Sequence, residues 1–373
     1  MMFTRFLWAF VFTFIFCSCS NDDDMITDDN PPDNFLAPNV TMIALSNDAQ
    51  SLLEISIDGT SSEVSTINLT DQLGITPADL ANNNETILTW FRQTTPNFKI
   101  WRRDLISKST TVLEDVCNIE NEQPFFVLGS ASQFAFFSQS EVGQNAFANI
   151  RISEDGSNCN QLQFKNAGII STHLENDNFW LLLRDSGNSN VLQLQRYDTG
   201  NASLQATATL TEPNAAITQI GDDLYIFFSD RYHIYNAMTL SLTTVVPYTP
   251  EVGRIPENGF FETQLNENAL LVRLAAIQPS PFTEWPGQID LTTGELLTNR
   301  NLGIVINEAI NQVSGYEGVQ LSFFDVDLSH NIIAYGFSDG NDTNGIVFTN
   351  FDAEILQIID TPAAPSQVYI TSF

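Results

Sequence analysis

Three residues in two long polar segments have the side-chain types that recognise a small polar ligand. Arg254 lies in residues 249–259, and Glu284 and Trp285 lie in residues 278–287, a segment that also contains three prolines. An indole ring can stack on a sugar or a peptide, while a carboxylate and a guanidinium hydrogen-bond to it. We therefore predict that Arg254, Glu284 and Trp285 form a binding site on stiff loops. The alternative is that Trp285 only fills a junction in the core.

Residues 99–104, Lys-Ile-Trp-Arg-Arg-Asp, form the chain's single cationic cluster and have the alternation of a strand. Successive side chains of a strand point to opposite faces, so Trp101 and Arg103 share one face. Together they could hold an anionic glycan. The alternative is structural: the arginines pair with local acids, an interaction of small energy at a surface.

The motifs of several common enzyme classes do not occur in the sequence. No two of the 19 glycines are separated by a single residue, and Gly-x-Ser-x-Gly, Ser-x-x-Lys and His-Glu-x-x-His are absent. The histidines His173, His233 and His330 have no second metal ligand at a suitable spacing. We assign no catalytic residue, no metal site and no cofactor. With 45 acidic residues, a catalytic carboxylate pair cannot be chosen, because its criterion is a distance in space.

Residues 339–345, Asp-Gly-Asn-Asp-Thr-Asn-Gly, have the composition of a calcium-binding loop. The fifth position of that motif requires Asp or Asn, but Thr343 stands there, and the segment is short for a full set of oxygen ligands. We predict a solvated turn.

The overall charge excludes two classes of partner. The 373 residues include 45 acidic and only 14 basic ones, for a formal net charge of −31. Nucleic acids and anionic lipid surfaces are both bound through clustered Lys and Arg, so neither is an expected ligand. Because 43% of the residues are hydrophobic, the chain can bury a large core.

The first 18 residues have the pattern of a signal peptide. Arg5 supplies positive charge, and residues 6–16 form an apolar run relieved by a single Thr. This run is too short to span a bilayer, which needs about 20 residues.

A lipidation signal follows the apolar run. Ser18 followed by Cys19 resembles a bacterial lipobox, which implies that Cys19 becomes the lipidated first residue of the mature protein. Phe16 stands where that pattern usually has Leu, which leaves Cys17 as an alternative site.

The next segment is acidic. Residues 20–24, Ser-Asn-Asp-Asp-Asp, resemble the export signal of surface-exposed lipoproteins of Bacteroidetes, which implies a lipid-anchored protein of the outer membrane facing outward. Residues 19–38 hold six Asp, three Pro and neither Lys nor Arg. Such a composition cannot bury apolar area, so we predict a disordered tether. The several lipid chains that the resemblance implies would make the anchoring stable.

Two cysteines remain in the rest of the chain. In an oxidising exported compartment, Cys117 and Cys159 can pair as a disulfide. Two separate buried thiols are the alternative, because spacing alone does not decide.

From about residue 40 the sequence has the pattern of a repeated β unit, in which short runs with period-two alternation are separated by Asn, Asp, Gly and Ser. Seven times, a strand ends at a polar turn and a second strand follows. The markers of these turns are Asp58, Asp104, Asp155, Asp198, Asn236, Asp290 and Asp352. Their spacing of 38 to 62 residues is close to the length of a propeller blade. In the sixth unit, the predicted strands include residues 260–264 and 295–297.

The two ends of the repeat are complementary. The first unit has only three predicted strands, and the chain ends in a spare one, residues 367–373. We therefore predict an all-β domain over residues 39–373, a seven-bladed β-propeller closed by the C-terminal strand. Six or eight blades, or a two-domain β-sandwich, are the alternatives. The chain looks like a divergent propeller without the dipeptides of WD40 or kelch repeats, a resemblance that implies no function.

The function expected from these features is binding. The sequence combines a lipidation signal, a tether and a closed ring, and it lacks enzyme motifs. These features favour a surface-anchored, non-catalytic propeller that binds or scaffolds a glycan, a peptide or a protein. The alternative is an extracytoplasmic enzyme on the same fold, such as a glycan lyase or hydrolase.

Overall fold

The computed structural model describes the chain from Asn39 to Ser372 apart from short internal gaps. The residues outside the described part are 1–38, 47–50, 75–78, 85–86, 95–96, 120–121, 131, 143–144, 186, 249–252, 255–264, 277–281, 299 and 373.

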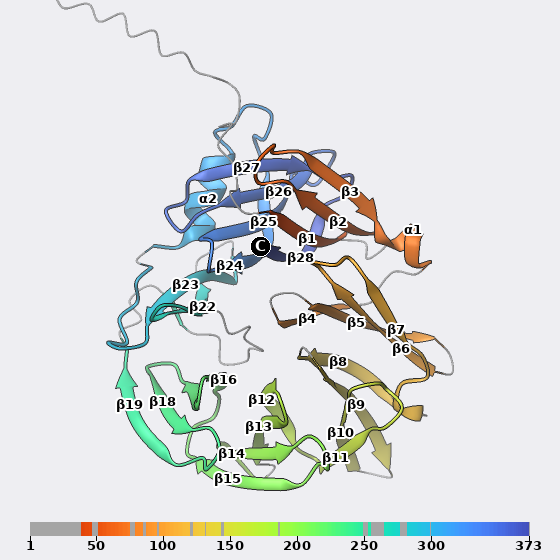
Figure 1. Cartoon of the computed structure of the whole chain (residues 1–373). Helices are drawn as coiled ribbons and strands as arrows, with labels where there is room; N and C mark the ends of the chain where they lie inside the picture. Colours follow the sequence, from red (N-terminus) through yellow and green to blue (C-terminus); the bar gives the residue numbers. More distant parts are fainter. Residues whose placement is uncertain are drawn as a thin grey trace, which may run out of the picture.

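Seven antiparallel sheets stand around one axis as a seven-bladed β-propeller (Figure 1), which confirms the predicted fold and blade number. We number the blades along the chain and give each blade's strands from the axis outward. Blade 1 consists of β28 (Pro365–Ser372), β1 (Val40–Ser46), β2 (Leu52–Ile57) and β3 (Val64–Asn68). Blade 2 consists of β4 (Asp79–Asn84), β5 (Ile87–Thr94), β6 (Asn97–Asp104) and β7 (Thr110–Leu113). Blade 3 consists of β8 (Gln123–Gly129), β9 (Phe134–Val142), β10 (Asn145–Ser153) and β11 (Asn160–Lys165).

The remaining blades follow the same order, with one irregular sheet. Blade 4 consists of β12 (Gly168–Glu175), β13 (Asn178–Asp185), β14 (Asn188–Asp198) and β15 (Leu204–Leu210). Blade 5 consists of β16 (Ala216–Ile220), β17 (Asp223–Phe227), β18 (Arg231–Asn236) and β19 (Leu242–Pro247). Blade 7 consists of β24 (Gln320–Asp327), β25 (Ile332–Ser338), β26 (Asn344–Thr349) and β27 (Ile355–Asp360). Blade 6 has two short strands, β20 (Gly253–Arg254) and β21 (Leu265–Asn266), on one edge of β22 (Ala269–Ala276), and β23 (Glu284–Asp290) on the other.

The ring is closed by the last strand. β28 pairs antiparallel with β1, with Ser372 opposite Val40 and Tyr369 opposite Ile43, so the C-terminus supplies the innermost strand of blade 1. The predicted closure is confirmed. Pairing the two ends of the chain covers a strand edge that each would otherwise expose.

A buried carboxylate supports this closure. Asp325, on the innermost strand of blade 7, is 3% exposed and its Oδ2 accepts the backbone N–H of Ile370 at 2.8 Å. That N–H therefore points away from β1, and a buried N–H without an acceptor would cost about 1–3 kcal/mol. Two residues further along the same strands, Asp327 accepts a hydrogen bond from the Ser372 hydroxyl. Both bonds join blade 7 to blade 1.

The core is divided among the junctions between blades. Among the described residues, seven clusters of buried apolar side chains occur, one at each junction. Strand alternation sends one face of a sheet into each neighbouring junction, so every blade contributes to two clusters. Each blade therefore depends on both of its neighbours for burial of its apolar surface.

The predicted turn residues cap the hairpins between the third and outermost strands. In blades 1 and 2, for example, Asp58 and Asp104 accept the N–H groups two and three residues further on at 2.8 to 2.9 Å. In blade 7 the predicted marker, Asp352, lies in the turn between β26 and β27, but Asn350 makes the cap by accepting the N–H groups of Asp352 and Glu354 at 3.0 Å. Asn and Asp side chains form such local bonds readily, which explains their recurrence.

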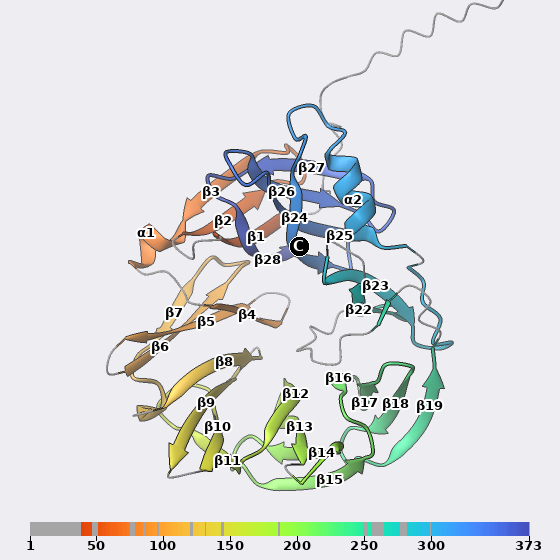
Figure 2. The ribbon, with the colours of Figure 1, turned by 180° about the vertical axis from the view of Figure 1, so that it is seen from behind.

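Blade 6 differs from the prediction in its outer strand. Its predicted outer strand at residues 295–297 is reduced to one bridge, between Leu296 and Ile289, and the predicted strand 260–264 lies outside the described residues. A helix that the sequence analysis missed follows, α2 (Leu302–Ile310), and Figure 2 shows it beside blade 7.

The sequence contains a helix signal for α2. The side chain of Asn301 caps its first turn by accepting the N–H of Ile304, and Leu302, Ile306 and Ile310 recur every four residues. These three side chains are buried in the cluster between blades 6 and 7. Two short helices lie elsewhere, α1 (Leu69–Leu73) and the 3-10 turn η1 (Val116–Asn118). None of the helices in the described part of the chain is long and apolar enough to cross a membrane.

The closure predicts a pH dependence. Burial raises the pKa of Asp325 from 3.8 to about 6, against the opposing effect of the Arg273 guanidinium. When an acid has a higher pKa in the folded state than in the unfolded state, its ionisation lowers the unfolding free energy. We expect the unfolding free energy of the native chain, relative to Asp325→Asn, to fall as pH rises from about 4 to about 6 and then to level off. Urea titrations across this range measure the difference, and a difference that grows with pH would contradict the assignment.

Candidate functional site

The structure separates two of the residues predicted to act together. Glu284 and Trp285 are neighbours on β23, so their side chains point to opposite faces of blade 6. Trp285 is 0% exposed in the cluster between blades 5 and 6, beside Leu274. This burial agrees with the alternative that Trp285 fills a junction in the core and not with stacking on a ligand, and the last part of the predicted loop belongs to β23. The backbone of Arg254 pairs with Ala275, while its side chain lies outside the described part.

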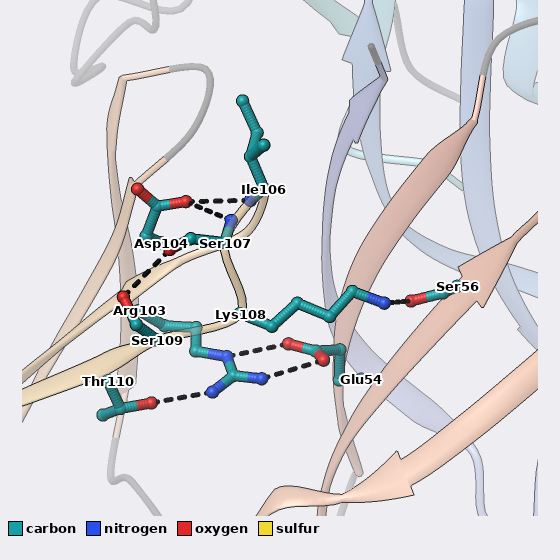
Figure 3. Close-up of polar contacts among 9 residues, drawn as sticks. All are labelled: Glu54, Ser56, Arg103, Asp104, Ile106, Ser107, Lys108, Ser109 and Thr110. Carbon is teal, nitrogen blue, oxygen red and sulfur yellow. Dashed lines mark hydrogen bonds and ion pairs between the residues drawn. The ribbon is translucent and has the colours of Figure 1, made fainter.

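The second predicted pair is also internal. Trp101 is 3% exposed and stacks on Trp90, with ring centroids 6.4 Å apart. Arg103 is 4% exposed and makes a bidentate ion pair with Glu54, each bond 2.9 Å long (Figure 3). A third bond runs from Arg103 to the Thr110 hydroxyl at 3.0 Å. These contacts agree with the structural alternative, in which the arginine pairs with an acid, and not with glycan binding, because neither side chain is available at the surface.

The Arg103–Glu54 pair joins neighbouring blades. Glu54 lies on β2 of blade 1 and Arg103 on β6 of blade 2. Nearby, Lys108 donates to the hydroxyl of Ser56 at 2.6 Å, which adds a second polar link between the same two blades (Figure 3). Arg103, from the cationic segment of the sequence, therefore helps to hold blade 2 against blade 1, while Arg102 of the same segment donates to the backbone of Ser130 in blade 3.

Cys117 and Cys159 form a disulfide bond in the structure. The bond connects η1, which precedes blade 3, to the turn that follows β10 of the same blade. A backbone hydrogen bond of 2.7 Å from Cys117 to Gly156 runs beside it. The disulfide thus fixes the entry into blade 3 to that blade's own outer hairpin. The predicted lipidation site, Cys19, lies outside the described residues.

Within the described residues, a Ser–His–Asp grouping lies at the ring closure. The Nδ1 atom of His330 lies 2.6 Å from the Ser372 hydroxyl and 3.4 Å from Asp327. In a nucleophilic triad the serine and the acid engage different ring nitrogens, so that a proton can pass through the ring. Here both engage Nδ1, so the grouping cannot act as that relay. Its geometry serves to hold the end of β28.

The other two histidines lie apart from this grouping. His173 is 3.4 Å from Glu175 on the same strand. His233 accepts a hydrogen bond of 3.3 Å from Arg231, and burial, followed by the charge of Arg231, lowers its pKa.

No three His, Cys, Asp or Glu side chains of the described part of the chain come together as metal ligands. Asp339, in the former calcium candidate, caps its own turn by accepting the N–H of Asn341 at 2.8 Å.

A different cluster gathers at the junction of blades 6 and 7, and we refer to Arg273, Glu284, Phe323, Tyr335 and Tyr369 as the junction site. Its centre is Arg273 on β22, whose guanidinium lies over the rings of Phe324 and Phe323 at 4.6 and 5.1 Å from their centroids. Aromatic faces attract a cation, so this stacking fixes the plane of the guanidinium. Glu284, one of the predicted residues, lies 3.9 Å from it.

Arg273 is held more loosely than the other arginines in ion pairs with glutamate. Arg103 contacts Glu54 at 2.9 Å, and Arg151 donates to Glu122 at 2.6 and 2.7 Å. The polar contacts of Arg273 within the described residues are 3.5 and 3.9 Å long, and its side chain is 26% exposed. A guanidinium has five N–H donors, so Arg273 keeps donor capacity for a further partner.

Aromatic rings extend the junction site toward the propeller axis. Phe323 lies on the innermost strand of blade 7, where a bulge between Leu321 and Phe324 breaks the register with β25. A bulge redirects a side chain, and here Phe323 is half-buried and close to Tyr369 of β28, with centroids 6.4 Å apart. The site thus draws on blades 6, 7 and 1.

A buried hydroxyl lies behind these rings. Tyr335 is 1% exposed, and its hydroxyl has no hydrogen-bond partner among the described residues. Its ring lies 5.3 Å from that of Phe324, which carries the guanidinium on its face. Burial raises the pKa of Tyr335, so it stays a neutral hydrogen-bonding group. The junction site therefore contains polar atoms whose hydrogen-bonding capacity the fold itself leaves incompletely used.

Sequence reasoning missed most of the junction site. One signal was present: Arg273 interrupts an otherwise apolar strand, Ala-Leu-Leu-Val-Arg-Leu-Ala-Ala. A charge in a half-buried strand needs a partner, and this one faces the next blade. Phe323 and Tyr369 gave no signal, because their proximity depends on ring closure and on the bulge.

Comparison with known proteins gives no family for the chain. No protein-family model and no curated protein sequence matches it. Among solved structures it is similar to dihydro-heme d1 dehydrogenase NirN in complex with DHE, with a TM-score of 0.43 and 8% sequence identity. That similarity covers 88% of this chain and 67% of that chain, and it assigns no activity.

The buried ion pair between blades 1 and 2 makes a stability prediction. Arg103→Met leaves the Glu54 carboxylate buried and unpaired, so we expect the unfolding free energy to drop by about 3–5 kcal/mol. The double variant Glu54→Leu/Arg103→Met removes both charges and should recover most of that loss. Urea denaturation of the three chains measures both effects. If Arg103→Met leaves the unfolding free energy unchanged, or if the double variant is no more stable than Arg103→Met, the structural role of the pair is refuted.

Proposed function

We propose that the protein is a surface-anchored lipoprotein whose propeller binds a ligand at the junction site without transforming it. The observation that carries this proposal is the state of Arg273. Its guanidinium is oriented by two aromatic rings and partly exposed, and its polar contacts with the described residues are 3.5 and 3.9 Å long. A charged group that is fixed in orientation and incompletely bonded is suited to hydrogen-bond a ligand.

The direction of the strands supports presentation of the site away from the membrane. β1 begins at the end of blade 1 that carries the Asp58 turn, where Asn39 also accepts the N–H of Gly59 at 3.0 Å. β22 begins at the equivalent end of blade 6, opposite Asp290, and Glu284 pairs near its far end. A tether that enters at Asn39 would leave the Glu284 end facing outward.

Several acids in the described part of the chain have structural contacts. Turn acids such as Asp58 bind neighbouring N–H groups, Glu54 and Glu122 pair with arginines, and Asp325 supports the closure. A catalytic carboxylate must remain available to the substrate, so these particular acids do not support the alternative of a glycan lyase or hydrolase.

Turnover is the test that separates binding from catalysis. The full-length chain, purified in detergent, is incubated with neutral and acidic polysaccharides and with a peptide mixture. We expect no new reducing ends, unsaturated products or free amines above a heat-denatured control. Release of any such product in proportion to protein concentration would establish an enzyme and overturn the non-catalytic assignment.

The anchor is tested separately, because it rests on residues 1–38 alone. Cells that express the chain are labelled with palmitate, and we expect the label to enter the native chain and Cys17→Ala but not Cys19→Ala. Protease added to intact cells should remove the propeller from the surface. Continued labelling of Cys19→Ala would refute Cys19 as the lipid site, and protection from protease would refute surface exposure.

A further inference from the structure

We propose that the ligand of the junction site is a neutral sugar, with its ring against Phe323 and Tyr369 and its hydroxyls between Arg273 and Glu284. This inference rests on the proposed binding function and names the class of ligand. It follows from the polar groups of the site, from the charges around them, from the aromatic rings and from the state of the nearest strand edge.

The polar groups suit a hydroxyl. The Nη1 atom of Arg273 and the Oε2 atom of Glu284 are 3.9 Å apart, which is beyond hydrogen-bond length. A hydroxyl group placed beside both can accept from the guanidinium and donate to the carboxylate, because it is donor and acceptor at once. Both side chains are partly exposed, at 26% for Arg273 and 38% for Glu284, so each can be reached.

The charges disfavour an ionic ligand of either sign. An anion at Arg273 would also meet the carboxylate of Glu284 at the surface and that of Asp325 behind it, on a chain with a net charge of −31. A cation would be repelled by the Arg273 guanidinium, which already lies over one face of Phe323 and one face of Phe324. A neutral ligand with many hydroxyls avoids both conflicts.

The rings supply the apolar part of the site. Phe323 and Tyr369 are half-buried on neighbouring innermost strands, with centroids 6.4 Å apart and planes inclined by 43°. A sugar presents C–H groups on the faces of its ring and hydroxyls at its edge. It can therefore contact the aromatic surface with its face while its edge reaches Arg273 and Glu284.

The nearest strand edge is unsuited to a peptide added as a further strand. Such a peptide would have to pair with the free N–H groups of an innermost strand. On β28, the N–H of Ile370 is already taken by Asp325 at 2.8 Å. A peptide strand would therefore lack one of its backbone partners on β28, which favours the sugar over an extended peptide.

The test measures binding with matched variants. The full-length chain in detergent is titrated by calorimetry with the neutral hexaoses of glucose, mannose and xylose, with hexagalacturonate and with hexaalanine. The site variants are Arg273→Gln, Glu284→Gln and Phe323→Leu. The control is Arg300→Gln, which removes the same charge from an exposed arginine bonded to the backbone of Asp352. Thermal melting of each variant shows that it is folded.

We expect at least one neutral hexaose to bind, and each folded site variant to weaken that binding by about tenfold or more, with the control unchanged. Binding of hexagalacturonate or hexaalanine that only the site variants abolish would overturn the sugar assignment and leave the binding function standing. No binding by any probe, or binding that the site variants leave intact, would overturn the junction site itself. Products released during titration would overturn the non-catalytic function instead.

Discussion

The structure depends above all on the pairing of its two ends. A propeller blade buries each of its faces against a neighbour, so an open ring would expose two sheet faces and an innermost strand edge. β28 prevents this by joining β1, and Asp325 completes the joint by accepting the N–H of Ile370 at 2.8 Å. The cost of keeping this carboxylate away from water is reflected in its raised pKa. Because the clusters at the junctions share blades, stability gained at the closure extends around the ring.

The unusual charge of the chain follows from where its acids are used. Many acids cap hairpin turns, where a carboxylate accepts two N–H groups at once, as Asp104 does for Ile106 and Ser107. Others are buried opposite arginines at junctions, as Glu54 is opposite Arg103. These acids therefore serve the fold of the described residues. Within this pattern Arg273 is different, because its stacking on Phe324 orients it while its nearest carboxylate, Glu284, remains 3.9 Å away.

The sequence predicts the fold well because the fold repeats. Asx-capped hairpins recur at the length of a blade, and the missing and spare strands at the two ends indicate closure. It predicts the site poorly, because the site is made by neighbours that are distant in sequence. Strand alternation shows that Trp285 and Glu284 face opposite ways, but only the packed ring shows that Trp285 is in the core. Similarly, Arg103 has a partner 49 residues away, and α2 was hidden within a unit that looked like a longer blade.

The central claim, that ring closure supports the whole propeller, can be tested by hydrogen exchange under native conditions. The amides of β28, including Ile370, should exchange as slowly as those of β13 and β14 in blade 4, which lie far from the closure, because opening the ring would unfold the whole domain. Peptides that cover residues 365–372 and 178–198 give the two rates by mass spectrometry. Matched protection of the two segments would agree with the account. Fast exchange in β28 while blade 4 stays protected would show that the closure frays locally, and would contradict it.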